Sequence, residues 1–294
     1  MGSYPPPDLP GHPPPILSTE QGSVVARGEV VGDMTDELRG NVAQSHARSW
    51  AFAPATYILV GINCAVFVAM LLAHVSFWSP TPDQLVLWGA NDPTNVLVFG
   101  EWYRVVTAMF VHVGIVHLAT NMWCLWNLGL LGEPLIGPFG VFAAYVLSGA
   151  AGNMLSIAIN MYQGRPELVG AGASGAVFGI AGVLIVLLKS PRLPIPAKDL
   201  AGLRRSVIYF AVLTFVIGFG SDRFHLGVNI DNMAHLGGLV GGIIFALPMV
   251  PLRGSPRELF LLRRRVAVGL MTGLLVFFGF YLTNVFPSSS FVNR

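Results

Sequence analysis

The sequence predicts an all-α polytopic membrane protein, a bundle of seven spanning helices. Hydrophobic residues make up 53% of the 294 residues and charged residues only 11%, and the mean hydropathy is +0.64. Since a soluble domain carries about 25% charged residues, this composition excludes the soluble class. Seven apolar runs free of Asp, Glu, Lys and Arg supply the expected helices. They are residues 57–78, 116–131, 138–159, 173–188, 207–220, 233–250 and 266–286.

The distribution of Lys and Arg predicts the orientation, because these residues accumulate in cytoplasmic loops. With the N-terminus inside, thirteen of the 17 basic residues fall in cytoplasmic segments and four fall outside. We therefore expect a cytoplasmic N-terminus and a C-terminus outside. The formal charge of +2 then reflects topology, and we expect the lipid bilayer, not a nucleic acid, as a partner of this chain.

Residues 1–52 precede the first run and contain two Pro-Pro-Pro triplets, Pro5–Pro7 and Pro13–Pro15. Their polar, Pro-rich composition is typical of disorder or extended polyproline segments. We expect a solvated cytoplasmic tail, with a ligand for a proline-binding module as the alternative. The tail lacks the apolar core of a cleavable signal peptide, so the first run itself is expected to direct insertion.

Between the first two runs, residues 79–113 form a long outside loop rich in aromatic side chains, including Trp88 and Trp102. Aromatic residues favour the headgroup level, so we expect a structured loop that lies partly in the outer leaflet. Residues 189–206 are expected to form an inside connection. The fifth run, 207–220, is short enough for a re-entrant segment, but the charge pattern favours a span.

Polar residues gather near the outer ends of the second, fourth and sixth runs, which all run from outside to inside. Ser174 opens the fourth run, and His235 lies about one turn into the sixth. His117 and Asn121 are four residues apart near the start of the second run, and so share one helix face. Ionisable groups at membrane depth are costly and point to function by default. We therefore expect these residues to meet in a water-accessible cavity that opens outward.

The residue types predict acyl-transfer chemistry in this cavity. An imidazole such as that of His235 can take the proton of Ser174 and later return it to a leaving amine. His117 and Asn121 are suited to donate hydrogen bonds to an oxyanion, and the backbone N–H of Ser174 at a helix N-terminus adds a donor. Phe178, one turn after Ser174, is placed to supply an aromatic wall for the His235 ring.

Glycines at spacings of three and four predict a close approach of the fourth and sixth helices. Small residues remove the side chains that would hold two backbones apart. This approach would bring Ser174 within reach of His235. The glycines concerned are Gly175, Gly179 and Gly182 in the fourth run and Gly237, Gly238, Gly241 and Gly242 in the sixth.

With these motifs in order over about residues 55–250, the chain resembles the rhomboid intramembrane serine proteases. One departure concerns Phe178, where some family members carry a tyrosine whose ring packs on the catalytic histidine. Stacking does not need the hydroxyl. The matching motifs are Glu101-Trp102-Tyr103-Arg104, His112, His117-x-x-x-Asn121, Gly172-Ala173-Ser174-Gly175 and Ala234-His235-Leu236-Gly237-Gly238.

The resemblance implies a rhomboid-like six-helix bundle plus one additional C-terminal transmembrane helix. Residues 53–252 would be the catalytic membrane domain, and residues 253–294 a basic loop, a seventh helix and a short outside tail. A Ser174 and His235 dyad would form an acyl-enzyme with transmembrane protein substrates near the outer face of a bacterial cell membrane. No metal or organic cofactor is implied. The oxyanion hole would comprise His117, Asn121 and Ser174, and the supporting residues would be Gly172, Gly175, Phe178, His112, Trp102, Arg104 and Gly238.

Three alternatives stay open at this point. Asp231, four residues before His235, would turn the dyad into a triad, but we favour a capping or solvated carboxylate there. A transporter would also use glycine-rich broken helices, although the sequence shows neither inverted repeats nor charges at the bilayer centre. A catalytically inactive rhomboid-like protein that binds membrane proteins would share the fold, but it should have lost Ser174 or His235.

Overall fold

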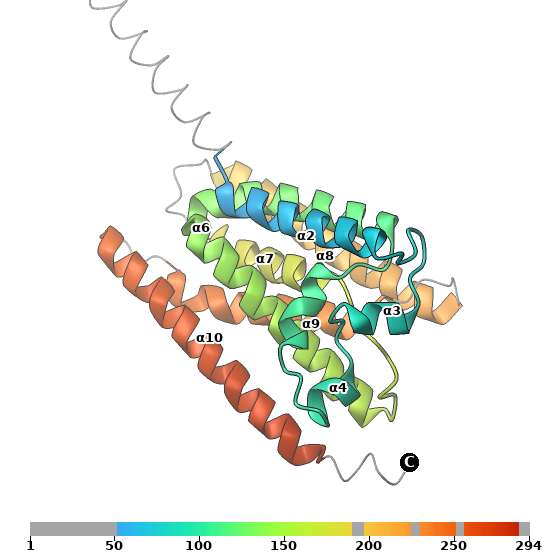
Figure 1. The fold of residues 1–294 in the computed structure, drawn as a ribbon. Helices are drawn as coiled ribbons and strands as arrows, with labels where there is room; N and C mark the ends of the chain where they lie inside the picture. The colour runs from blue at the N-terminus through green and yellow to red at the C-terminus, as the bar shows by residue number, and fades with distance from the viewer. Residues whose placement is uncertain (1–51, 190–196, 225–229, 251–255, 288–294) are drawn as a thin grey trace, which may run out of the picture. The chain divides into compact units, whose positions relative to one another are not determined.

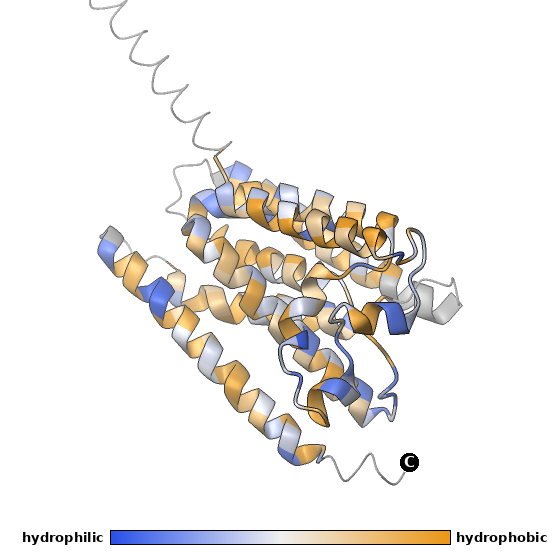
Figure 2. Ribbon diagram, in the orientation of Figure 1, coloured by the Kyte–Doolittle hydropathy of each residue, from blue (hydrophilic) through white to orange (hydrophobic). Residues whose placement is uncertain are grey.

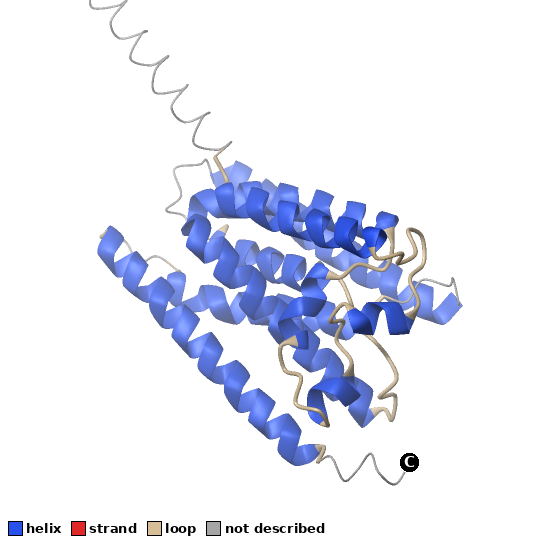
Figure 3. Cartoon of the chain, viewed as in Figure 1, coloured by secondary structure: helices blue, strands red, loops and turns tan. Residues whose placement is uncertain are grey.

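The computed structural model describes residues 52–189, 197–224, 230–250 and 256–287, and within these ranges the chain forms helices joined by loops (Figures 1 and 3). Residues 1–51 of the predicted tail lie outside the described residues. The helices in chain order are α2 (Pro54–Leu72), α3 (Pro82–Leu87), α4 (Pro93–Leu97), α5 (Arg104–Thr107), η1 (Ala108–Phe110), α6 (Ile115–Tyr162), α7 (Ser174–Leu187), α8 (Ala197–Phe224), α9 (Asn232–Ala246), η2 (Leu247–Met249) and α10 (Arg257–Val285).

Each of the seven predicted apolar runs falls at least in part on a helix in the described part of the chain, although the first run, residues 57–78, extends beyond the end of its helix α2 at Leu72. The second and third runs lie in α6, which breaks between Pro134 and Pro138 at Gly137, a residue with φ of +75°. Among the residues described, five helices, α6 included, have the length and apolar character needed to cross a membrane, and α7 is a shorter apolar helix. Since α6 supplies two of the predicted spans, the all-α polytopic membrane fold is confirmed. Figure 2 shows the mainly apolar character of the long helices.

The fifth predicted run is part of a longer helix. α8 contains 28 residues, and its stretch from Lys198 to Ile217 is long and apolar enough to span. The predicted inside connection is therefore shorter than expected, because helical structure begins at Ala197. The charged residues at this end of α8 hid the helix start, since apolar runs report only the part of a helix that lies in hydrocarbon.

α7 is the central helix of the bundle. Every residue from Gly175 to Leu184 is buried, so the helix is covered on all sides. Its most extensive contacts are with α9 and α6, which also pack on each other. A helix that is apolar around its whole circumference has no solvated face and is stable only inside a bundle. The residues that follow Ser174 in α7 thus form the buried centre of the helix bundle.

Glu133 anchors the start of α2 from the C-terminal end of the first half of α6. Its carboxylate accepts hydrogen bonds from the Ala55 N–H at 2.9 Å and from the Thr56 N–H and hydroxyl at 2.8 and 2.7 Å. The side chain is only 3% exposed. A carboxylate at a helix N-terminus satisfies free N–H groups and complements the helix dipole. Glu133 therefore docks α2 onto α6.

The loop between α2 and α6 is structured, as predicted, by α3, α4, α5 and η1. Arg104 is 7% exposed and pairs with Glu101 at 2.5 Å, while its Nη1 donates to the carbonyls of Val86 at 2.7 Å and Ala90 at 3.2 Å. Arg104 thus ties α5 to the end of α3. These contacts are those of a structural residue.

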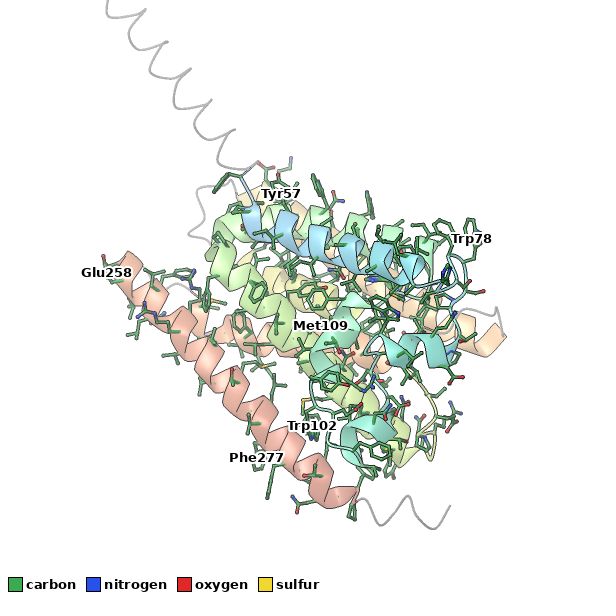
Figure 4. The ribbon with its side chains drawn as sticks, in the orientation of Figure 1. Tyr57, Trp78, Trp102, Met109, Glu258 and Phe277 are labelled. Atoms are coloured by element: carbon green, nitrogen blue, oxygen red, sulfur yellow. The ribbon has the colours of Figure 1, made fainter. Side chains whose placement is uncertain are left out.

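Trp102 joins the same loop to α10, the predicted seventh spanning helix. Its ring lies beside α10, where a Cβ atom built on Gly279 would be 3.5 Å from Cζ3 of the tryptophan (Figure 4). Leu282 of α10 is buried in the same apolar cluster as Val105 of the loop. α10 is therefore a support for the loop as well as an additional spanning helix.

We expect Glu133→Ala to destabilise the fold. The substitution leaves two buried N–H groups and one hydroxyl without an acceptor, at a cost of about 1–3 kcal/mol for each buried group. The measurement is the midpoint of thermal unfolding in detergent, with Glu258→Ala as the control, because Glu258 is exposed at the start of α10. Equal midpoints for the two variants would contradict the anchoring role of Glu133.

Candidate active site

Gly172 and Ala173, the two residues directly before Ser174, are each held by a backbone hydrogen bond. The Gly172 N–H donates to the carbonyl of Ala108 at 2.9 Å, and the Ala173 N–H donates to Nε2 of His112 at 3.5 Å. Gly172 has a φ of +128°, and a Cβ atom there would lie 2.5 Å from Cε1 of His117. Only glycine fits this conformation and this space. The backbone thus enters α7 in one defined direction.

His112 acts as a neutral acceptor for this loop. Its side chain is fully buried, and its Nδ1 lies 3.4 Å from the carbonyl of Phe110. Because the Ala173 N–H can only donate, Nε2 accepts and the proton sits on Nδ1. Burial, with a smaller contribution from His117, lowers the pKa of His112 to about 3. At neutral pH the imidazole is therefore uncharged, as this role requires.

Ser174 is the first residue of α7 and is partly exposed. The N–H groups in the first turn of a helix have no partner within the helix, so this end of α7 presents free donors. Within the described residues the Ser174 hydroxyl makes no hydrogen bond, and it is open to an incoming group. Catalytic hydrogen bonds in unliganded proteins are often long and shorten when substrate binds.

His235 stacks on the helix that carries Ser174. Its ring is 4.4 Å from that of Phe178, centroid to centroid, with an interplanar angle of 8°, and it is only 3% exposed. Phe215 of α8 meets the imidazole edge-on at 6.1 Å. Phe178 lies one turn after Ser174. The predicted aromatic wall is therefore present, and it brings the His235 ring to the turn of α7 that Ser174 begins.

Glycines make this stack geometrically possible. A Cβ atom on Gly238 would lie 2.0 Å from the carbonyl oxygen of Gly175, and one on Gly242 would lie 1.9 Å from that of Gly179. From α6, a Cβ atom on Gly152 would come within 2.4 Å of the Ala234 carbonyl oxygen of α9. The backbones of α7 and α9 are thus in direct contact, as the glycine spacing predicted.

His117 lies beside the Ser174 loop. Its Nδ1 accepts a hydrogen bond from the Val113 N–H at 3.4 Å, which leaves the proton on Nε2. That nitrogen would be 3.0 Å from a Cβ atom on Gly172. His117 therefore presents an N–H group at the entrance to α7.

Asn121 is buried on the same face of α6 as His117. Its amide donates to the carbonyl of His117 at 2.9 Å, a bond within its own helix. The second amide proton is left for another acceptor. The predicted pair is therefore adjacent, but this hydrogen bond directs one N–H of Asn121 along α6 and not toward Ser174.

Asp231 caps α9. Its Oδ1 accepts a hydrogen bond from the Ala234 N–H at 2.8 Å, and its Oδ2 accepts one from the Ser156 hydroxyl at 2.5 Å. Nδ1 of His235 has no hydrogen-bond partner among the described residues. These are the contacts of the capping carboxylate that we favoured over a triad member.

Several polar residues at the site were not singled out in the sequence. Asn153 donates to the Val105 carbonyl at 2.9 Å, and Asn91 donates to the Asn153 carbonyl at 3.0 Å while pairing with Gly170 in an isolated antiparallel bridge. Asn232 is buried three residues before His235. Two features of the sequence could have pointed to these residues: Asn153 lies inside the third apolar run, and Asn232 lies three residues before His235.

The fold and these contacts define a polytopic helical membrane protein with a polar site where the N-terminal ends of α6, α7 and α9 meet. The rhomboid domain matches residues 99–252, which are 154 of the 294 residues. The chain therefore belongs to the rhomboid family, and the predicted resemblance is confirmed.

Individual relatives agree with the family assignment. The chain is 29% identical over 226 residues to Rhomboid protease GluP of Bacillus subtilis, which covers 77% of this chain and 40% of that protein. It is 33% identical over 188 residues to Rhomboid-like protease 2 of Toxoplasma gondii, with coverage of 63% and 62%. It is 27% identical over 244 residues to Rhomboid protease AarA of Providencia stuartii, with coverage of 76% and 83%. The chain thus spans less than two thirds of the length of the first two relatives.

We expect Gly238→Ala to disrupt the contact between α7 and α9. The added methyl group would overlap the Gly175 backbone, and overpacking of this kind costs about 1–3 kcal/mol or more. The control is Gly273→Ala in α10, where a Cβ atom meets nothing within 4 Å. Thermal unfolding in detergent should give a lower midpoint for Gly238→Ala alone. A wild-type midpoint for that variant would show that the two backbones are not in contact.

Proposed function

We propose that this chain is an intramembrane serine endopeptidase that cleaves transmembrane proteins near the outer face of the membrane. The observation that carries the proposal is the stack of His235 on Phe178, one helical turn from Ser174, across a glycine contact that admits no side chain. Membership of the rhomboid family supports it, since the relatives above are named as proteases.

Ser174 and His235 form the proposed dyad. Oγ of Ser174 attacks the scissile carbonyl carbon while its proton passes to Nε2 of His235. The carbon–nitrogen bond then breaks, and His235 gives the proton to the leaving amine, which leaves an ester on Ser174. Water that is deprotonated by His235 hydrolyses this ester and restores the free serine. Stacking on Phe178 holds the imidazole plane through both steps.

The oxyanion is stabilised by donors at the entrance to α7. The first-turn N–H groups, beginning with that of Ser174, are free of intrahelical partners, and the helix dipole favours negative charge there. The Nε2–H of His117 and the second amide proton of Asn121 complete the set. Donors fixed before the reaction stabilise the transition state without reorganisation. Gly172 and His112 serve this set by fixing the loop that presents the Ser174 N–H.

The orientation of the chain follows from its basic residues. We place the N-terminus and the tail of residues 1–52 in the cytoplasm and the C-terminus outside, in a bacterial cell membrane. The catalytic membrane domain is residues 53–252, and residues 253–294 add the seventh helix. In this orientation the N-terminal ends of α6, α7 and α9 face outward, so cleavage occurs near the outer surface.

We expect Ser174→Ala and His235→Ala to abolish cleavage of a tagged single-span substrate in proteoliposomes. Each variant removes one partner of the proton transfer. Thermal unfolding of Ser174→Ala should stay close to that of wild type, while His235→Ala, which truncates a ring that is 3% exposed and stacked on Phe178, should keep a cooperative transition at a lower midpoint. Ser206→Ala is the matched control, because Ser206 is exposed on α8. Folded wild-type protein that cleaves no substrate would instead indicate a rhomboid-like protein that binds membrane proteins without catalysis.

We expect His117→Ala and Asn121→Ala each to lower kcat by about 10²–10³-fold, the usual loss when one oxyanion donor is removed. Asn127→Ala is the control. Asn127 makes the same bond to the carbonyl four residues earlier, but on the exposed face of α6. A kcat for Asn121→Ala within about threefold of wild type would exclude that residue from the oxyanion hole.

A further inference from the structure

The amide of Asn232 is a buried polar group that the proposed mechanism does not use. The residue lies in the first turn of α9 and is only 5% exposed. In the described part of the chain neither Oδ1 nor Nδ2 has a hydrogen-bond partner. An unpaired buried amide destabilises a fold, so packing alone does not account for an asparagine at this position.

A second unpaired buried atom lies one turn away. Nδ1 of His235 also has no partner among the described residues. Asn232 and His235 are three residues apart and so share one face of α9. Side chains on a helix lean toward its N-terminus, which places the His235 ring over the turn that contains Asn232. Two complementary groups are therefore neighbours on a single helical turn.

The other side chains near this imidazole already make other hydrogen bonds or cannot accept one from Nδ1. Asp231 on the same helix accepts hydrogen bonds from the Ala234 N–H and the Ser156 hydroxyl. His117 of α6 uses its Nδ1 to accept from Val113. α7 contains no titratable side chain, and its contact with the ring is Phe178, while the contact from α8 is Phe215. Asn232 is thus the polar side chain best placed to serve Nδ1.

The stack leaves one degree of freedom that matters for proton transfer. Parallel packing on Phe178 fixes the plane of the imidazole but not its rotation by 180° about the Cβ–Cγ bond, which exchanges the positions of the ring nitrogens and carbons. A general base needs the lone pair of Nε2 to face the serine, and hence a proton on Nδ1. A hydrogen bond from Nδ1–H fixes both the rotation and the tautomer.

We propose that Asn232 is a positioning residue whose Oδ1 accepts a hydrogen bond from Nδ1–H of His235 and so directs Nε2 toward Ser174. This inference rests on the proposed protease function. Asn232 contacts neither the substrate nor the reacting atoms in this scheme and acts only through His235. It supplies with a neutral amide the orientation that a carboxylate supplies in a serine–histidine–aspartate triad.

The test compares Asn232→Leu and Asn232→Asp with wild type in proteoliposomes, measuring kcat, KM and the midpoint of thermal unfolding. Leucine keeps the volume and removes the acceptor, so kcat should fall by about 10–100-fold with KM unchanged, a typical loss for a residue that orients a catalytic group. The unfolding midpoint should stay level or rise, because an unpaired buried amide is gone. Aspartate keeps the acceptor oxygen and should retain kcat within about threefold of wild type.

The matched control is Asn284→Leu, since Asn284 is exposed on α10 and bonded within its own helix. It should behave as wild type. A wild-type kcat for Asn232→Leu would overturn the inference and leave the proposed protease function standing. A fall in kcat for both Asn232 variants together with a lower unfolding midpoint would show a purely structural residue. Wild-type protein that cleaves nothing would remove the proposed function, and this inference with it.

Discussion

The close packing of α7 against α9 is the constraint on which the rest of the site depends. The carbonyl oxygens of Gly175 and Gly179 occupy the space that side chains at positions 238 and 242 would need. In a bilayer the hydrophobic effect does not drive helices together, so association depends on van der Waals contact and hydrogen bonding. Backbone contact maximises both, and it is what allows an imidazole on one helix to stack over the first turn of the other.

The surrounding elements fix the positions of α7, α9 and the loop before Ser174 relative to one another. His112 and the carbonyl of Ala108 bind the loop, and both belong to the segment between α2 and α6 that Arg104 ties together. Trp102 extends this support to α10, and Glu133 fixes α2 against α6 at its other end. Irregular backbone at membrane depth needs partners for its polar groups, and these contacts supply them.

Much of this architecture could be predicted from sequence because of one strong rule: a segment that crosses the hydrocarbon core of a membrane must be predominantly apolar. The seven apolar runs follow from that rule, and Ser174, His235 and His117 stand out as polar exceptions within it. The start of α8 at Ala197 was missed, since the helix there is charged and lies beyond the apolar run. The carbonyl of Ala108 carries no signal in a sequence, because any residue provides a carbonyl. The direction of the Asn121 amide depends on a rotamer that spacing does not determine.

The most direct test of the central claim, that Ser174 is activated by His235, is to map the adduct of a fluorophosphonate on the detergent-solubilised protein by peptide mass spectrometry. The account predicts one phosphonate per chain, located on the peptide that contains Ser174, and no adduct when His235 is replaced by alanine. An adduct on another serine, or a folded wild-type protein that remains unmodified, would contradict it.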